Sequence, residues 1–204
     1  MLAGVFVGGA GSRMGGVAKG LLRAPDGQPI VVRTVRMLSA LGIPCVLVGA
    51  HAAYTEVAKE LDVPVIADAP VGIGPLGGLV GLLQHAMKCV QESALPHSLR
   101  AADQAFRVLT IGSDMPYLTS ELLIRLCAAP AAQVVAPRID GRWQPLFARL
   151  DVAVALPVAM RRAADNQRAL HGLLEELNAQ DLLLSLDEAM ALRDWDFASD
   201  VEEQ

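Results

Sequence analysis

The N-terminal stretch is an apolar run that leads directly into a glycine-rich loop: Leu2-Ala3-Gly4-Val5-Phe6-Val7, then Gly8-Gly9-Ala10-Gly11-Ser12-Arg13-Met14-Gly15-Gly16-Val17-Ala18-Lys19-Gly20. The run predicts a buried β-strand. Glycines permit positive φ and let backbone N–H groups turn inward, so a loop of this kind after a strand is typical of phosphate binding. Arg13 and Lys19 place a cation near either end of the loop, as a triphosphate requires. The segment therefore predicts a phosphate site in an α/β protein.

Two familiar phosphate-binding loops do not match this segment. A dinucleotide-binding fingerprint needs Gly-x-Gly-x-x-Gly, but Met14 stands where the third glycine should follow Gly9 and Gly11. A P-loop needs Gly-Lys-Ser/Thr, whereas Lys19 lies between Ala18 and Gly20. An NAD-dependent oxidoreductase is therefore disfavoured.

Downstream of the loop, short apolar runs alternate with amphipathic helical patterns. Strands are expected at residues 2–7, 45–49, 63–67, 108–111, 134–137 and 143–148. Helices are expected at 29–41, 55–61 and 76–90, with helical character over 151–186, where Pro157 breaks or starts a helix. Apolar strands separated by helices predict a mostly parallel sheet that is covered on both faces.

The length and composition fit one domain over residues 1–204, with a polar surface insertion at 88–106 and a frayed acidic tail at 197–204. The net charge of −5 gives no sign of a nucleic-acid partner. Three scattered cysteines (Cys45, Cys89 and Cys127) indicate neither a disulfide framework nor a zinc ribbon. With no membrane span and no signal peptide in the pattern, we expect a cytoplasmic protein without a membrane partner.

Asp114 follows the apolar run at 108–111 after only two residues. A carboxylate at the carboxyl end of a parallel strand points into the crevice where α/β sheets bind ligands. Mg²⁺ prefers one or two carboxylates together with phosphate oxygens, so Asp114 is a candidate metal anchor. The alternative is that Asp114 caps the helix that begins near Thr119.

Four ordered motifs carry a resemblance to a known family. They are the loop stretch Phe6–Leu22, Gly74-Pro75-Leu76-Gly77-Gly78-Leu79, Ser113-Asp114-Met115-Pro116 and Gln144-Pro145-Leu146-Phe147. Together they resemble the molybdenum cofactor guanylyltransferase family across residues 2–148. This resemblance implies a Rossmann-like three-layer sandwich, the nucleotide-diphospho-sugar transferase fold. It further implies Mg²⁺-dependent transfer of GMP from GTP to the phosphate of molybdopterin-bound molybdenum, with release of pyrophosphate.

The resemblance also implies roles for individual residues. Arg13, Lys19 and Asp114 would be catalytic. Nucleotide contacts would come from Phe6, Val7, Gly8, Gly9, Gly11, Gly15, Lys19, Asp68, Gly77 and Asp114. The metal would be held by Asp114 with Asp194 and Asp196. Strand-like alternation would put Asp194 and Asp196 on one face and Trp195 on the other. The alternatives are a loop-capping role for Asp68 and a solvated acidic tail around Asp194.

Other functions stay open at this point. One is a cytidylyl- or sugar-1-phosphate nucleotidyltransferase of the same fold. The other is a GTP-binding, cofactor-handling module without transferase activity, since Ala18 stands where the family has an aspartate. The resemblance also implies transient contact with cofactor-delivery proteins or molybdoenzymes.

Overall fold

The computed structural model describes residues 1–8, 18–92, 106–130 and 132–195. Within these residues, seven strands form one sheet in the order β3-β2-β1-β4-β8-β5-β9. Only β8 runs antiparallel to its neighbours, β4 and β5. The strands are β1 (Leu2–Phe6), β2 (Cys45–Val48), β3 (Val65–Ile66), β4 (Arg107–Gly112), β5 (Val134–Ala136), β8 (Phe147–Asp151) and β9 (Gln180–Asp181). A separate hairpin pairs β6 (Arg138–Ile139) with β7 (Arg142–Trp143).

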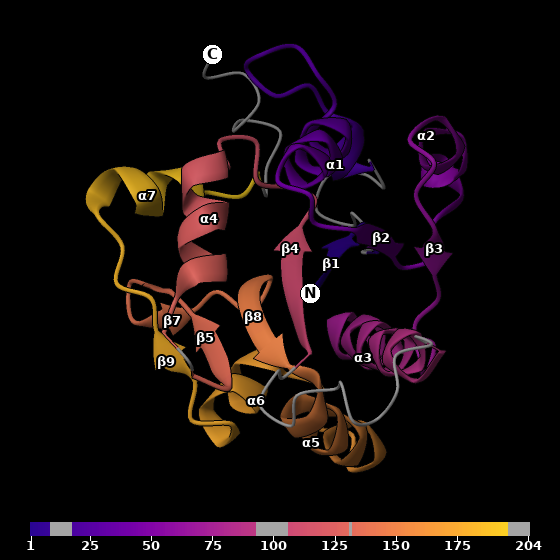
Figure 1. Cartoon of the computed structure of the whole chain (residues 1–204), viewed down its shortest axis with the longest axis vertical. Coiled ribbons are helices and arrows are strands. Elements are labelled where there is room, and N and C mark those ends of the chain that lie inside the picture. The colour runs from indigo at the N-terminus through magenta and orange to yellow at the C-terminus, as the bar shows by residue number, and fades with distance from the viewer. Residues whose placement is uncertain (9–17, 93–105, 131, 196–204) are drawn as a thin grey trace.

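Helices cover both faces of the sheet (Figure 1). One face carries α1 (Ile30–Ala40), α2 (Thr55–Glu60), α4 (Ser120–Ala128) and α7 (Leu186–Ala191). The other carries α3 (Pro75–Glu92), α5 (Val152–Ala164) and α6 (Leu170–Glu176). Two short 3₁₀ turns, η2 (Lys19–Leu21) and η3 (Ala52–Tyr54), lie in connections.

Side-chain alternation along β1 explains the two apolar layers. Ala3 and Val5 pack with α1 and α4, whereas Leu2 and Phe6 pack with α3 on the opposite face. Both faces are apolar because both are covered, as a central parallel strand requires. The predicted three-layer α/β sandwich with a mostly parallel sheet is confirmed.

Three expectations for the C-terminal half are wrong in detail. Residues 144–146 separate β7 from β8, so the strand expected at 143–148 is two elements. The helical segment expected from residue 151 begins one residue later, because Asp151 ends β8 and caps α5 by accepting hydrogen bonds from the N–H groups of Ala153 and Val154. The strand β9 also interrupts this segment. Pro157 lies inside α5, which continues through it because Ala155 and Ala159, on either side of the proline, are buried in the core against α3.

The predicted insertion and tail lie mostly beyond the described residues. The helix α3 extends through Glu92, so the first part of the 88–106 segment is helical. Residues 93–105 and 196–204 lie outside the described part of the chain. Among the residues that the structure does describe, no helix is both long and apolar enough to cross a membrane.

A buried arginine joins β8 to the end of α4. The side chain of Arg149 is 0% exposed and donates hydrogen bonds of 2.6 to 3.5 Å to carbonyl oxygens over residues 126–132. The last carbonyls of a helix have no partner within it, and they favour a nearby positive charge. Burial lowers the pKa of Arg149, and the charge of Arg107 lowers it further. Arg149 therefore provides hydrogen-bond donors for the carbonyl groups at the end of α4, and these carbonyls, not a carboxylate, are its partners in the described structure.

We expect Arg149→Met to lower the free energy of unfolding by about 3 kcal/mol, because it leaves several buried carbonyls without a donor. Urea denaturation followed by circular dichroism measures this loss. The control is Arg125→Met on α4, where the exposed side chain pairs with Glu188 on the surface and the loss should be far smaller. Equal losses in the two variants would contradict the role of Arg149.

Candidate functional site

The carboxyl ends of β1 and β2 approach each other unusually closely. The N–H groups of Val7 and Gly8 both donate to the Val48 carbonyl, at 3.0 and 3.3 Å. Gly49 has a φ of +105°, and a Cβ at this position would lie 2.8 Å from the Gly8 Cα. Glycine is therefore required at position 49 by both its backbone conformation and the lack of space.

A second close approach brings the loop after β1 onto the end of β4. The Gly20 N–H donates to the Tyr54 hydroxyl at 3.0 Å. A Cβ on Gly20 would lie 2.9 Å from both that hydroxyl and the Ser113 Cβ. The loop can therefore pass here only with glycine at position 20.

This packing puts two of the predicted catalytic residues side by side. Lys19 Nζ lies 3.6 Å from Asp114 Oδ2, and the two side chains are 19% and 25% exposed. A cation and a carboxylate thus share one partly buried spot at the carboxyl edge of the sheet. Asp114 does not cap the helix that follows it. Thr119 caps α4 instead, by accepting a hydrogen bond from the Leu122 N–H at 3.2 Å.

Tyr54 supports this pair and was not predicted from the sequence. Burial is the main cause of its raised pKa, and the negative charge of Asp114 raises that pKa further; hydrogen bonds from Gly20 and with Ser113 oppose the shift. The phenol therefore stays protonated at neutral pH. Tyr54 lies 34 residues from Gly20 along the chain, so no local pattern indicates the contact.

Asp68 follows β3 at the same edge of the sheet. Its Oδ1 lies 3.4 Å from the position of a Cβ on Gly78 and 3.8 Å from that on Gly49. Burial raises the pKa of this carboxyl group. No donor within the described residues hydrogen-bonds the carboxylate, so the loop-capping alternative finds no partner there. Its surroundings are glycine surfaces, which leave room for a ligand group.

Gly77 is held by main-chain contacts. Its N–H donates to the Gly74 carbonyl at 2.9 Å, and its own carbonyl accepts from the Ala69 N–H at 2.9 Å. A Cβ on Gly77 would lie 2.4 Å from the Pro70 oxygen, and one on Gly81 would lie 2.4 Å from the Ala67 oxygen. Close packing of residues 67–70 on α3 thus explains the helix glycines.

Phe6 and Val7 offer only their main chain to this edge. The Phe6 side chain is buried on the α3 side and the Val7 side chain on the α1 side. The Phe6 carbonyl accepts a hydrogen bond from the Ser113 N–H at 3.2 Å. These two residues therefore shape the end of β1.

The segment around Asp194 runs beside Asp114. The Trp195 N–H donates to the Asp114 carbonyl at 3.0 Å, and its ring is 1% exposed and packs edge-on against Tyr117. Asp194 is exposed and Trp195 is buried, but residues 193–195 form no strand, so the strand-like alternation expected here is wrong. Arg13, Gly9, Gly11, Gly15 and Asp196 lie outside the described residues.

The described residues contain no cluster of three or more His, Cys, Asp or Glu side chains that could enclose a metal ion. Mg²⁺ does not need one, because it is commonly bound through one or two carboxylates with phosphates and waters. Asp114 is such a carboxylate, and the Trp195 N–H that bonds its carbonyl brings the backbone of residues 194–195 next to it. The residues present therefore fit a metal that arrives with a phosphorylated ligand.

A three-layer α/β fold that gathers glycines, a lysine and an aspartate at the carboxyl edge of a mostly parallel sheet is typical of nucleotide-binding α/β proteins. The family model of the MobA-like NTP transferase domain matches residues 3–181, and the chain belongs to this family. The family resemblance inferred from the sequence is thereby confirmed.

Curated relatives match most of the chain. A molybdenum cofactor guanylyltransferase of Burkholderia cenocepacia is 32% identical over 175 residues, which cover 80% of this chain and 77% of the relative. A protein of the same name from Pseudomonas putida is 34% identical over 173 residues, which cover 81% and 78% of the two chains.

Solved structures share the fold at low sequence identity. The 2-C-methyl-D-erythritol 4-phosphate cytidylyltransferase of Thermus thermophilus superposes with a TM-score of 0.61 at 14% identity, covering 99% of this chain and 95% of that one. A 4-diphosphocytidyl-2C-methyl-D-erythritol synthase gives a TM-score of 0.64 at 12% identity, covering 98% and 94%. These likenesses show a common fold.

We expect Asp68→Asn to raise the melting temperature at pH 7. A raised pKa means that ionising Asp68 destabilises the folded state, so stability falls as pH rises from the unfolded value of about 3.9 through the folded pKa. The gain should vanish at pH 3, where the carboxyl group is protonated in both states. Differential scanning calorimetry at the two pH values checks this. Asp181→Asn on exposed β9 serves as the control, and an equal gain there would contradict the burial effect.

Proposed function

We propose that this protein transfers GMP from GTP to the phosphate of molybdopterin-bound molybdenum and releases pyrophosphate. The Lys19–Asp114 pair at 3.6 Å is the observation that carries the proposal, because a cation for the phosphates and a carboxylate suited to Mg²⁺ lie together at the carboxyl edge of the sheet. The names of relatives that match about four-fifths of the chain support guanylyl transfer in particular.

The proposed reaction forms one bond and breaks one. An oxygen of the acceptor phosphate attacks the α-phosphorus of GTP, and the bond between this phosphorus and the oxygen bridging to the β-phosphate breaks. A phosphomonoester is largely ionised near neutral pH, so the attack needs no general base. What the protein must provide is in-line alignment and neutralisation of charge.

Each side chain of the site then has a defined task. Lys19 neutralises the phosphates of GTP and the leaving pyrophosphate, together with Arg13 from the glycine-rich loop. Asp68 accepts hydrogen bonds from the nucleoside, and the glycine surfaces of Gly8 and Gly49 admit it closely. Asp114 and Asp194 would hold Mg²⁺, which supplies electrophilic activation of the phosphate when bound.

The product of the reaction tests the proposal directly. The protein is incubated with Mg²⁺ and molybdopterin-bound molybdenum in four parallel reactions that contain GTP, CTP, UTP or ATP. The masses of the products are measured by mass spectrometry. We expect an adduct heavier by one GMP unit, with one pyrophosphate released, and only from GTP. A cytidylyl adduct would identify a cytidylyltransferase, and GTP binding without pyrophosphate release would identify a binding module; either result overturns the proposal.

We expect Lys19→Ala and Asp114→Asn each to lower the single-turnover rate about a hundredfold, since each removes one preorganised charge-stabilising group. Rapid-quench measurement of pyrophosphate release checks this, with circular dichroism to verify folding. Lys59→Ala is the matched control, because Lys59 lies on α2 in an exposed pair with Glu56. Rates within twofold of the parent for Lys19→Ala would remove the lysine from the mechanism.

A further inference from the structure

The β6–β7 hairpin stands at the same edge of the sheet as Asp114. Since β4 and β5 are both antiparallel to β8, they run parallel to each other, and their carboxyl ends share an edge. The hairpin begins two residues after β5. Its turn contains Asp140 and Gly141 at φ values of +50° and +74°, the conformation of a tight two-residue hairpin.

Residues 144–146 tie the hairpin to the end of β4. The Gln144 N–H donates to the Pro137 carbonyl at 2.9 Å, and the Leu146 carbonyl accepts from the Gly112 N–H at 2.8 Å. A Cβ on Gly112 would lie 2.7 Å from Asp114 Oδ1 and 3.7 Å from the Leu146 Cβ. The strand that leaves the hairpin therefore passes directly beside the Asp114 carboxylate.

Arg138 on this hairpin is held flat by an aromatic ring. It pairs in register with Trp143, and its guanidinium carbon lies 3.9 Å from the centroid of the Trp143 ring. Trp143 is 5% exposed and packs in the core with α6, so it forms a fixed platform. No carboxylate among the described residues pairs with Arg138, although its side chain is exposed.

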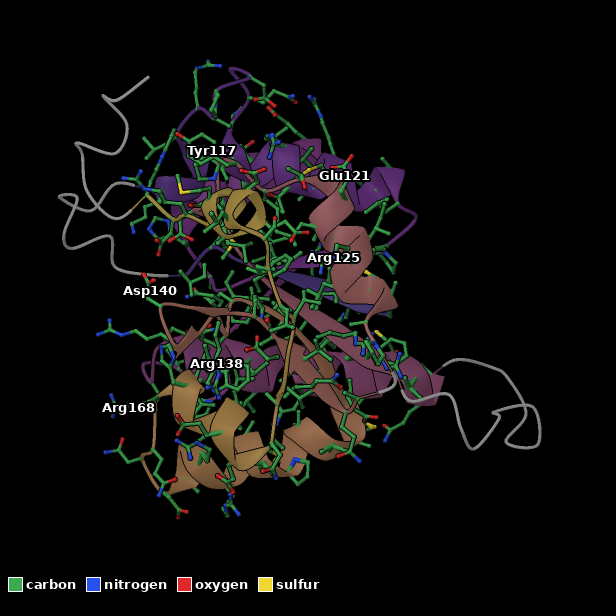
Figure 2. All side chains as sticks on the ribbon, turned by 90° about the vertical axis from the view of Figure 1, so that its left-hand side faces the viewer. Tyr117, Glu121, Arg125, Arg138, Asp140 and Arg168 are labelled. Carbon is green, nitrogen blue, oxygen red and sulfur yellow. The ribbon has the colours of Figure 1, made fainter. Side chains whose placement is uncertain are left out.

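Figure 2 shows Asp140, at the tip of the hairpin, between Tyr117 and Arg138 on one face of the molecule.

An arginine that stacks on a ring and has no carboxylate partner within the described residues is suited to a flat ligand. The planar guanidinium stacks on aromatic faces on both of its sides, and one side is already fixed by Trp143. The order of the strands places Asp68, Gly49 and Gly8 on the β3-β2-β1 side of Asp114 and the hairpin on the β8-β5 side. A nucleoside on the first side leaves the second side for the acceptor.

We propose that Arg138 is a specificity-determining residue for the acceptor, whose planar pterin ring stacks on the guanidinium face opposite Trp143. This inference rests on the proposed function, since it takes the acceptor to be a pterin phosphate. The Arg138–Trp143 stack fixes the end of the acceptor that is remote from the reacting phosphate, and the phosphate itself lies at Lys19 and Asp114.

Steady-state kinetics and GTP binding of variants test this assignment. We expect Arg138→Ala to raise the KM for the acceptor about tenfold, with the dissociation constant for GTP unchanged. Arg138→Lys should not restore the KM, because it keeps the charge but loses the plane. Arg142→Ala is the matched control, since Arg142 pairs with Ile139 and projects from the other face of the hairpin. An unchanged KM in Arg138→Ala, full activity in Arg138→Lys, or an equal defect in Arg142→Ala would overturn the proposal.

Two competing probes separate stacking from simple anion binding. Free pterin, which lacks the phosphate, should inhibit the parent competitively against the acceptor and should lose this inhibition in Arg138→Ala. Inorganic phosphate should inhibit both proteins equally. If only phosphate loses its effect in Arg138→Ala, Arg138 binds an anion and the stacking proposal is wrong. If the parent protein itself transfers no GMP to the acceptor, the proposed function fails and this inference fails with it.

Discussion

The close contact of Gly20 with Tyr54 and Ser113 is the constraint on which the site depends. The backbone at Gly20 enters the space between a phenol and the end of β4, and the hydrogen bond to Tyr54 holds it there. The neighbouring residue, Lys19, then has its ammonium group 3.6 Å from Asp114. Any side chain larger than hydrogen at position 20 would push this lysine away from the carboxylate. The position of the Lys19–Asp114 pair is therefore set by main-chain packing.

The remaining edge of the site is built by the same means. Gly49 and Gly8 meet without side chains between them, and Gly77 and Gly81 let residues 67–70 lie on α3. Asp68 is thereby held among glycine surfaces, where burial raises its pKa. An ionised group held at a cost in stability is typical of a functional position. Close main-chain packing and a partly buried carboxylate thus meet at this edge of the sheet, whereas the buried charge of Arg149 lies at the end of α4.

The fold was largely predictable from the sequence because its strands are apolar on both sides and its helices are amphipathic, which are local patterns. Lys19 could be singled out as a cation of the glycine-rich loop and Asp114 because it lies two residues after a predicted strand, and parallel strands bring their carboxyl ends together. The contacts of Tyr54 with Gly20 and of Trp195 with Asp114 join residues that are distant along the chain. The limits of β8 escaped prediction for a similar reason, since Gln144 and Leu146 bond to Pro137 and Gly112 rather than within one strand. Pro157 was misjudged because packing outweighs the loss of one helical hydrogen bond.

The position of β8 has a consequence for how the chain folds as it is synthesised. β4 and β5 precede β8 in the sequence, yet β8 lies between them in the sheet. Newly made chain up to residue 136 can join β1 to β4, but β5 has no neighbour until residues 147–151 leave the ribosome. Arg149 arrives in the same segment, so the end of α4 is also satisfied only then. The N-terminal half of the sheet can therefore form early, and the hairpin side of the site is completed late in translation.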